Sequence, residues 1–345
     1  MPRPDAPQRR PTMATIAREA GVSVPTVSKV LNGWSQVAPE TRQRVEKLLR
    51  ERGYVRRRGD RAGAAHSMVD VVIDSLDNSW AAALLAGVEA ACHERNLGVS
   101  VSVARGNGRA CTGTWVDTVV ARGSRGVIAA LVDLTPNQQS KLERSGIPCV
   151  MVDPVATPEA SVYSVGATNW AGGRSATEHL IELGHRRIAV LGGPADVLCI
   201  QARVAGYRAA MEQAGLAVPD HYVSYGSDFS TYAGRDLTAE FLDLEDRPTA
   251  LFVCADTLAL GAYRAITERE LSVPADLSVV GFDDRPESHW VSPRLTTVRQ
   301  PVEEMAVAAL DLLARLIRGQ HPRSRRTELA TILLERESTG APKRS

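Results

Sequence analysis

Apolar residues recur at helical spacing in the first sixty residues and divide them into three short segments. The pattern predicts helices over about residues 14–20, 24–31 and 39–52. Gly21 ends the first segment, where glycine tolerates the left-handed backbone of a helix C-terminus, and Ser23 is a good N-cap for the second. Two helices joined by a glycine turn are typical of a helix-turn-helix, whose second helix enters the major groove of DNA. The alternative is a small three-helix bundle used for protein contacts.

From Met68 onward the pattern changes to short β-branched runs that alternate with alanine-rich amphipathic segments. Strands that alternate with helices in this way predict parallel sheets flanked by helices. The expected strands are residues 69–73, 99–103, 126–131, 148–152, 187–191, 250–254 and 278–282. The expected helices are residues 80–95, 115–122, 136–145, 170–183, 202–214, 231–242, 256–270 and 306–317.

A repeated segment divides this larger region in two. Residues 86–91 (AGVEAA) match residues 205–210 (AGYRAA), and each segment follows the first strand of its series. The repeat predicts two similar lobes with a cleft between them, and such folds bind ligands at the carboxyl ends of their strands. A chance match between two alanine-rich helices is the alternative. The predicted fold class is thus an all-α headpiece followed by an α/β domain of two parallel-sheet lobes.

The charge of the chain is uneven, although 41 Lys and Arg against 40 Asp and Glu leave a net charge of only +1. Residues 1–63 hold 14 basic and 6 acidic residues, and the remainder holds 27 basic and 34 acidic residues. A basic head on an acidic body is typical of a polyanion-binding module attached to a globular domain. A basic tail that binds nothing would give the same charge pattern.

Other classes of protein find little support in the sequence. The five cysteines are widely spaced and form no CxxC pair, which argues against a disulfide framework and a structural zinc site. The basic, proline-containing start has no apolar run of the kind found in secretory signals, and no segment is apolar enough to span a bilayer. No GxSxG, Walker A or HExxH motif indicates an enzyme. We expect a cytoplasmic protein that is not an enzyme and has neither metal nor cofactor.

The headpiece also carries a specific resemblance. Residues 16–33 (IAREAGVSVPTVSKVLNG) resemble the headpiece of the lactose-repressor (LacI/GalR) family of bacterial transcriptional regulators, and Val37, Glu40-Thr41 and Gly53-Tyr54 match its continuation. The resemblance implies operator DNA as a partner, with Val24, Pro25 and Lys29 at base-reading positions. It implies phosphate contacts for Ser23, Thr26, Ser28 and Asn32. The candidate DNA-binding residues are Ile16, Ser23, Val24, Pro25, Thr26, Ser28, Lys29, Asn32, Tyr54, Arg56, Arg57 and Arg58.

The segment after the headpiece departs from the family pattern. Family members usually have Pro-Asn after the tyrosine and then a short hinge helix, whose leucine enters the minor groove and kinks the duplex. Here Val55 and three arginines follow Tyr54, and Gly63 stands about where that leucine would be. The arginines can enter a narrow minor groove or contact phosphates. DNA binding is therefore expected here, but the sequence does not establish a hinge helix.

The resemblance continues through the body at residues 183–189 (LGHRRIA), 281–284 (GFDD) and 293–298 (PRLTTV), among others. It implies a regulatory domain like the periplasmic sugar-binding proteins, with Arg203 and Asp283 as a pair that contacts the effector. An arginine fork and a carboxylate acceptor suit the hydroxyl groups of a sugar. The full set of candidate effector residues is Trp80, Asp153, Arg203, Asp256, Asp283 and Trp290. Either tryptophan can stack on a sugar ring or pack in the core.

These observations predict a sequence-specific DNA-binding regulator, a repressor, that is controlled by a carbohydrate-like effector and acts as a homodimer or higher oligomer. The alternatives are a sugar-binding protein and a regulator that responds to a non-sugar metabolite such as a nucleoside. The expected segments are a basic tail (1–11), a helix-turn-helix domain (12–55), an Arg/Gly-rich linker (56–67), a two-lobed domain (68–338) and a tail (339–345). Residues 68–155 with about 285–338 are expected to form one lobe, and residues 160–284 the other.

Overall fold

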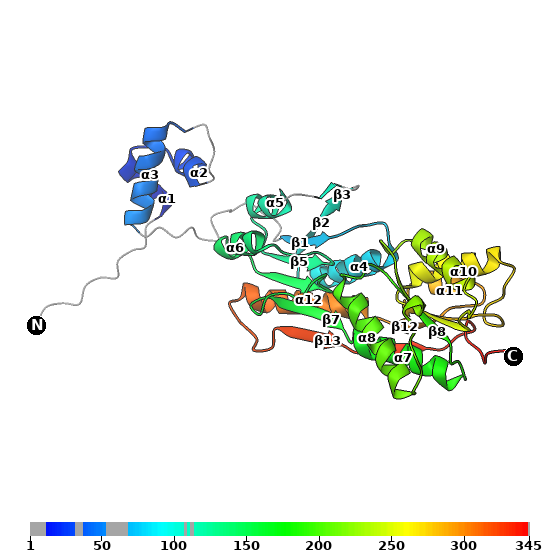
Figure 1. Cartoon of the computed structure of the whole chain (residues 1–345). Coiled ribbons are helices and arrows are strands. Elements are labelled where there is room, and N and C mark those ends of the chain that lie inside the picture. Colours follow the sequence, from blue (N-terminus) through cyan, green and yellow to red (C-terminus); the bar gives the residue numbers. More distant parts are fainter. Residues whose placement is uncertain (1–11, 32–36, 53–67, 107–108, 111–113, 344–345) are drawn as a thin grey trace, which may run out of the picture. The chain divides into compact units, whose positions relative to one another are not determined.

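The computed structural model describes residues 12–31, 37–52, 68–106, 109–110 and 114–343. The chain forms two compact units, Met1–Ala65 and His66–Ser345, each of which is described by itself (Figure 1). The predicted basic tail, the predicted linker and the candidate residues Asn32, Tyr54, Arg56, Arg57 and Arg58 lie outside the described residues.

The first unit contains the three predicted helices, α1 (Met13–Ala20), α2 (Val24–Leu31) and α3 (Pro39–Glu51). Gly21 has a left-handed backbone with φ of 66°, and the Ser23 hydroxyl accepts a hydrogen bond from the Thr26 amide at 3.3 Å. Both caps are therefore confirmed. The core of this unit consists of Ile16, Ala17, Ala20, Val27, Val30, Val37 and Val45.

The first lobe of the larger unit is built on a parallel sheet in the order β13-β7-β6-β5-β1-β2. Its strands are β1 (Met68–Ile73), β2 (Gly98–Val103), β5 (Gly126–Ala130), β6 (Cys149–Val152), β7 (Tyr163–Ala167) and β13 (Arg326–Leu329). Helices α4 (Ser79–His93) and α12 (Val302–Ile317) share a core with one face, and α5 (Thr114–Arg122) and α6 (Pro136–Arg144) pack on the other side. A short hairpin, β3 (Arg105–Gly106) and β4 (Arg109–Ala110), follows β2.

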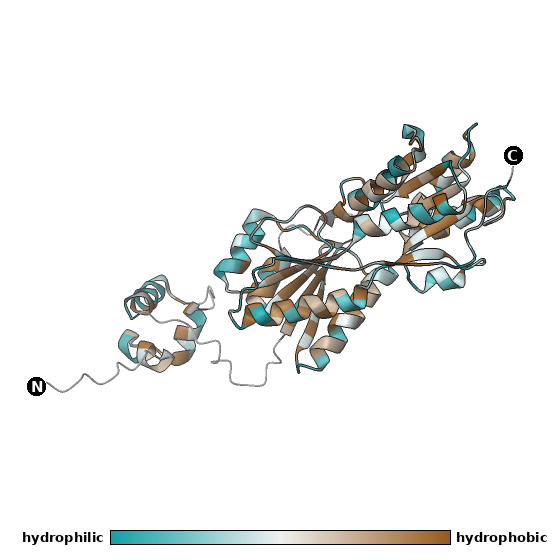
Figure 2. Cartoon of the chain, turned by 90° about the horizontal axis from the view of Figure 1, so that it is seen from below, coloured by the Kyte–Doolittle hydropathy of each residue, from teal (hydrophilic) through white to brown (hydrophobic). Residues whose placement is uncertain are grey.

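The second lobe has a sheet in the order β14-β12-β11-β10-β8-β9, in which only β14 is antiparallel to its neighbour. Its strands are β8 (Ile188–Gly192), β9 (Val223–Tyr225), β10 (Ala250–Val253), β11 (Ser278–Asp283), β12 (Thr296–Arg299) and β14 (Ile332–Leu334). Helices α7 (Asn169–Glu182) and α8 (Leu198–Gln213) cover one face, and α9 (Thr231–Leu242) and α10 (Asp256–Glu268) the other. The short helices η1 (Asp220–Tyr222) and α11 (Glu287–Trp290) lie in connections. The strands are apolar and the helices expose polar faces (Figure 2).

The predicted lobe boundaries are wrong in two places. Strand β7 pairs with β6 and therefore belongs to the first lobe, which extends to Ala167 rather than residue 155. Strand β12 pairs with β11 and therefore belongs to the second lobe, although residues 285–338 were expected in the first. The chain returns to the first lobe only in α12 and β13, and it then crosses again to the second lobe, where it forms β14.

Two glycines bring α7 and α8 into direct backbone contact. A Cβ atom on Gly206 would lie 2.1 Å from the Trp170 carbonyl oxygen, and one on Gly173 would lie 2.2 Å from the Arg203 carbonyl oxygen. Because real side chains do not tolerate such distances, only glycine permits this packing. The contact fixes the position of α8, and with it the side chain of Arg203.

None of the helices that the structure describes is long and apolar enough to cross a membrane.

Candidate functional site

A cleft between the two lobes collects polar side chains from the carboxyl ends of strands in both sheets. Asp153 directly follows β6, Asp283 ends β11, and Gln300 directly follows β12. Together with Arg203 and Trp80 these residues line a cavity of about 70 Å³, which we call the inner chamber. A larger hollow of about 440 Å³ lies elsewhere in the first lobe, beside Tyr163 and Arg325. We place the candidate site in the cleft because its charged groups are buried and converge there.

Arg203 is the centre of a buried hydrogen-bond network. Its Nε donates to Asn169 Oδ1 at 2.8 Å, and its Nη1 donates to the Cys254 carbonyl at 2.6 Å. Nη1 also lies 3.3 Å from Asp283 Oδ1, and the guanidinium stacks 3.6 Å from the centre of the Phe282 ring. With 3% of its surface exposed, Arg203 is buried although it lies on a helix.

Gln300 joins the two lobes through the same network. Its Oε1 accepts hydrogen bonds from Trp80 Nε1 at 3.1 Å and from Arg203 Nη2 at 3.3 Å, and its Nε2 donates to Asp153. Gln300 was not identified from the sequence. Its position directly after a strand of a parallel sheet was the available signal.

Burial shifts the acidity of both carboxylates in the inner chamber. Removal from water raises the pKa of Asp283 to about 6, against the lowering effect of Arg203 and Arg285. Burial also raises the pKa of Asp153, although the charge of Arg203 and the hydrogen bond from Gln300 act in the opposite direction. The chamber therefore holds two carboxylate acceptors whose charged forms are poorly solvated. A hydrogen bond that a ligand donates to such a carboxylate is stronger than the same bond in water.

Three residues that line the inner chamber have a left-handed backbone without being glycine. The φ angles are 51° at Leu131, 43° at Asp153 and 115° at Asp283. Each stands at the carboxyl end of its strand, namely β5, β6 and β11. Such backbone conformations cost on the order of 1–3 kcal/mol each and persist where the surrounding structure holds them.

The structure places two of the predicted effector residues outside this chamber. Trp290 is 78% exposed and is not among the described residues that line the cleft, so its predicted stacking on a sugar there is wrong. Asp256 is fully buried beside the chamber, and its two oxygens accept from the Arg285 amide at 2.9 Å and from the Thr297 hydroxyl at 2.7 Å. Because both oxygens have protein partners, Asp256 fixes the loop that carries Arg285.

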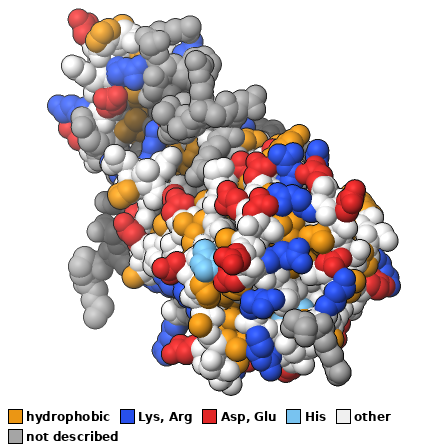
Figure 3. All heavy atoms as spheres, turned by 45° about the vertical axis from the view of Figure 1, so that its right-hand side comes forward, with side chains coloured by type: hydrophobic (Ala, Val, Ile, Leu, Met, Phe, Trp, Pro, Cys, Tyr) orange, Lys and Arg blue, Asp and Glu red, His pale blue; other side chains and the backbone are white. Residues whose placement is uncertain are grey.

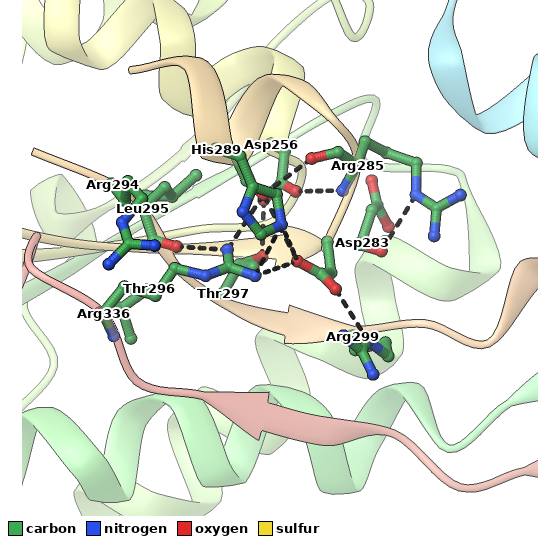
Figure 4. Close-up of polar contacts among 12 residues, drawn as sticks. Asp256, Asp283, Arg285, His289, Arg294, Leu295, Thr296, Thr297, Arg299 and Arg336 are labelled. Atoms are coloured by element: carbon green, nitrogen blue, oxygen red, sulfur yellow. Dashed lines mark hydrogen bonds and ion pairs between the residues drawn. The ribbon is translucent and has the colours of Figure 1, made fainter. Parts of the chain in front are cut away.

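Asp283 and Asp284 are adjacent but belong to different networks, as expected for neighbouring residues at a strand end. Asp284 forms ion pairs with Arg336 and with Arg299, the latter at 2.8 Å, and lies 3.6 Å from His289. Arg336, Arg299 and His289, which make these contacts, are labelled in Figure 4. This cluster ties the segment after β14 to the second lobe.

A second cavity of about 270 Å³, the outer chamber, adjoins the first and shares four lining residues with it. The shared residues are Asn78, Trp80, Leu131 and Phe229. Asn78, Phe229 and Cys199, which lines the inner chamber, were not identified from the sequence either, and their loop or helix-start positions gave no distinctive signal.

The headpiece presents most of its candidate residues at the surface. On α2, Val24, Pro25 and Lys29 are exposed, and Thr26 and Ser28 are partly exposed, so their side chains are accessible to a duplex. Ser23 is exposed at the N-terminus of the same helix. Ile16 is fully buried in the headpiece core, so its predicted DNA contact is wrong. On the face of the body seen in Figure 3, acidic and basic side chains are interspersed.

Two family models match the chain. Residues 12–57 match the model described as bacterial regulatory proteins, lacI family, and residues 177–339 match a periplasmic binding protein-like domain. Among curated proteins, the HTH-type transcriptional regulator CelR of Thermobifida fusca is 34% identical, and the alignment covers 96% of this chain and 99% of that protein. The ribose operon repressor of Escherichia coli K12 is 32% identical, with 95% and 99% covered.

Two solved structures agree with this similarity over nearly the whole chain. A complex of the transcriptional regulator CelR with cellobiose has a TM-score of 0.73 at 34% identity and covers 95% of this chain and 100% of that one. The lac repressor dimer bound to operator and the anti-inducer ONPF has a TM-score of 0.71 at 31% identity, with 96% and 100% covered. The chain therefore belongs to the lacI family of bacterial regulatory proteins and is a DNA-binding transcriptional regulator with a periplasmic-binding-protein-like domain.

Proposed function

We propose that this protein is a repressor whose affinity for operator DNA is set by a small carbohydrate bound in the cleft between the two lobes. The observation that carries the proposal is the buried set of Arg203, Asp283, Asp153 and Gln300, which converges from both lobes on one chamber. An arginine fork, two carboxylates and an amide match the paired hydroxyl groups of a sugar. Because it must reach DNA, we propose that the protein acts in the cytoplasm, and we assign it no catalytic role.

DNA recognition is assigned to the exposed side of α2. Lys29 donates to base edges in the major groove, while Val24 and Pro25 offer apolar contact, for example to a thymine methyl group. Ser23, Thr26 and Ser28 contact phosphates, aided by the amides at the helix N-terminus. Asn32 and the segment with Tyr54 and its arginines extend this interface in the proposal.

The effector acts by changing how the lobes meet. Arg285 Nη1 contacts Glu303 at 3.4 Å, Ser79 donates to Glu287, and Trp80 donates to Gln300, so each contact joins the lobes. A sugar that replaces part of this network binds one arrangement of the lobes better than another. The free energy of sugar binding then differs between the two arrangements. A difference of 1–3 kcal/mol is typical of allosteric coupling and would change operator affinity about 5- to 150-fold.

We further propose a homodimer in which Trp290 and Tyr232 form part of the subunit contact. The two side chains are 78% and 67% exposed, the highest exposed fractions among the large hydrophobic residues that the structure describes. Two headpieces would then bind two half-sites of a near-palindromic operator. The lac repressor dimer on its operator supports this arrangement by similarity.

The proposal is tested by selecting DNA sites from a random pool with the full-length protein and measuring affinity for the selected site with and without sugars. We expect a near-palindromic site whose affinity changes in the presence of one sugar class. Lys29→Ala should lose preference for the selected site, whereas Lys141→Ala, a partly exposed lysine in the other unit that pairs with Asp117, should behave like the unchanged protein. Equal affinity for selected and random DNA would contradict the DNA-binding role, and an operator affinity that no sugar alters would contradict the sugar switch.

A further inference from the structure

The outer chamber has a composition that differs from that of the inner one. It is lined from the first lobe by Asp74, Ser75 and Asn78 and from the second by Asp196, Ser227 and Asp228, with Trp80 and Phe229 at its junction with the inner chamber. Among the described residues that line it, three are acidic and none is Lys, Arg or His. A ligand in this space therefore meets hydrogen-bond acceptors and negative charge.

The inner chamber alone is too small for a sugar ring in this structure. Its volume of about 70 Å³ is well below the roughly 300–1,000 Å³ that is usual for small-molecule pockets. Its polar groups already bond one another, so a ring enters only by replacing the contacts among Arg203, Asp283 and Gln300. The outer chamber, at about 270 Å³, must accommodate the remaining bulk of any ligand that reaches the inner chamber.

We propose that the effector is an uncharged two-ring carbohydrate, a disaccharide, with one ring among Arg203, Asp153 and Asp283 and the other in the outer chamber. The carboxylates of Asp74, Asp196 and Asp228 exclude phosphorylated and other anionic sugars. This proposal rests on the effector site of the proposed function and specifies its ligand by size and charge.

The chemistry of the outer chamber favours a sugar ring over a nucleobase. Carboxylates only accept hydrogen bonds, and a pyranose ring offers several hydroxyl donors, whereas a base offers few. Trp80 and Phe229, which line both chambers, can contact the apolar face of a ring. Because the chamber walls come from both lobes, the second ring contacts both and favours the arrangement in which they are close.

The charge of the chamber disfavours anions for a simple electrostatic reason. A phosphate group beside three carboxylates is repelled by each of them, and because Asp196 and Asp228 are exposed this repulsion weakens as the salt concentration rises. We expect each disaccharide 6-phosphate to bind at least about tenfold more weakly than its neutral counterpart, because like-charge contacts are an effective means of rejecting a ligand.

The test is a thermal-shift and calorimetric titration of the full-length protein with cellobiose, maltose, lactose and trehalose. The same measurements are made with their 6-phosphates, with glucose and ribose, and with adenosine and cytidine. We expect one neutral disaccharide to stabilise the protein in a concentration-dependent way and to bind at least about tenfold more tightly than either monosaccharide.

Asp196→Lys tests the role of charge directly, because Asp196 is exposed and its replacement is tolerable for folding. The variant should bind the matching 6-phosphate at least about fivefold more tightly than the unchanged protein does. Glu212→Lys is the matched control, since it makes the same charge change at an exposed position of α8 outside both chambers. The control should leave both affinities unchanged.

Several results would overturn the proposal. A monosaccharide that binds as tightly as every disaccharide would refute the size requirement, and a 6-phosphate that binds as tightly as its neutral counterpart would refute the charge requirement. Binding of a nucleoside alone, or of nothing in the panel, would refute the carbohydrate assignment. Operator affinity is measured separately without ligand. A failure of the disaccharide proposal is therefore distinguishable from a failure of the proposed repressor function.

Discussion

Asp283→Asn is predicted to make the protein more stable and less responsive to its effector. The substitution keeps the shape of the side chain and an oxygen that can accept from Arg203, but it removes the negative charge. Asp283 is 8% exposed and touches the inner chamber, so its charge is held away from water. The stability of the protein and its function therefore make opposite demands on this residue.

The size of the effect follows from the acidity of Asp283. Burial raises its pKa from 3.8 to about 6 despite Arg203, a difference worth about 3 kcal/mol at about 1.4 kcal/mol per pKa unit. Holding this carboxylate ionised at pH 7 costs about that much, so asparagine should raise the free energy of unfolding by about 1–3 kcal/mol. Hydrogen bonds to a charged acceptor contribute about 1.5–3 kcal/mol, so effector affinity should fall about 10- to 150-fold.

The neighbouring Asp284 supplies a matched control with the opposite sign. Burial acts to raise its pKa, but hydrogen bonds from Arg336 and Arg299 outweigh this and lower it below the ordinary value. The ionised form of Asp284 therefore stabilises the native state, and this contribution is lost as the pH falls through its folded pKa. Asp284→Asn should lower the free energy of unfolding by about 1–3 kcal/mol, because the ion pairs with Arg336 and Arg299 lose their negative partner. The loss is no larger because Arg336 keeps its bonds to the Leu295 carbonyl and the Ser288 hydroxyl.

Urea denaturation at pH 7, followed by tryptophan fluorescence, measures both variants against the unchanged protein. Calorimetric titration with the effector and operator binding without it complete the comparison. If Asp283→Asn lowers the free energy of unfolding by more than about 1 kcal/mol, or abolishes operator binding without effector, Asp283 holds the fold together and the assignment of its charge to effector binding is wrong.

Three further predictions concern the C-terminus, the helix contact and pH. A chain that ends at Glu337 should lose about 2–4 kcal/mol of unfolding free energy in urea, because Ser338 is fully buried, accepts from the Thr296 amide at 2.7 Å and donates to the Val279 carbonyl at 2.6 Å. Gly206→Ala should lower the melting temperature and weaken effector binding together in thermal-shift titrations, since its Cβ would lie 2.1 Å from the Trp170 carbonyl oxygen and would separate α7 from α8; unchanged binding would show that this helix contact does not position Arg203. Effector affinity, measured by calorimetry from pH 5 to pH 8, should be full above about pH 6 and fall below it, because the ligand needs ionised Asp283, and Asp283→Asn should remove this dependence. The raised pKa of Asp283 has the opposite effect on stability. The contribution of Asp283 to the free energy of unfolding is fully present below pH 3.8 and is lost as the pH rises through about 6.

Local patterns predicted the long helices and seven strands of the two large sheets, but they did not predict β7, β9, β12, β13 or β14. The membership of strands in sheets depended on partners far away in the chain. Helix α2 begins and ends at the predicted residues, because a serine cap and an apolar stripe are local signals. Strand β7 contains Gly166 and pairs with β13, more than 150 residues further on, so no local pattern identified it as part of the first sheet. The crossings between the lobes were therefore misplaced.

The candidate site was predictable only in part, for a related reason. Arg203, Asp153 and Asp283 were identified through the resemblance, and the structure brings them together around one chamber. The sequence could not show that Asp256 has both oxygens occupied by protein donors, or that Trp290 is exposed and lines neither chamber. Residue type gives the chemistry that a side chain can perform, but burial and partners decide whether it is available.

From the backbone at the strand ends we expect that these side chains can be changed without losing the chamber. Leu131, Asp153 and Asp283 have positive φ angles of 51°, 43° and 115°, and each follows or ends a strand that pairs on both sides within its sheet. The sheet therefore holds a conformation that these residues would not adopt alone, at a cost of about 1–3 kcal/mol each. Since strand pairing, rather than the side chain, fixes the backbone there, replacing the Asp283 carboxylate removes an acceptor and leaves the walls of the chamber in place. For this reason Asp283→Asn can separate effector binding from folding.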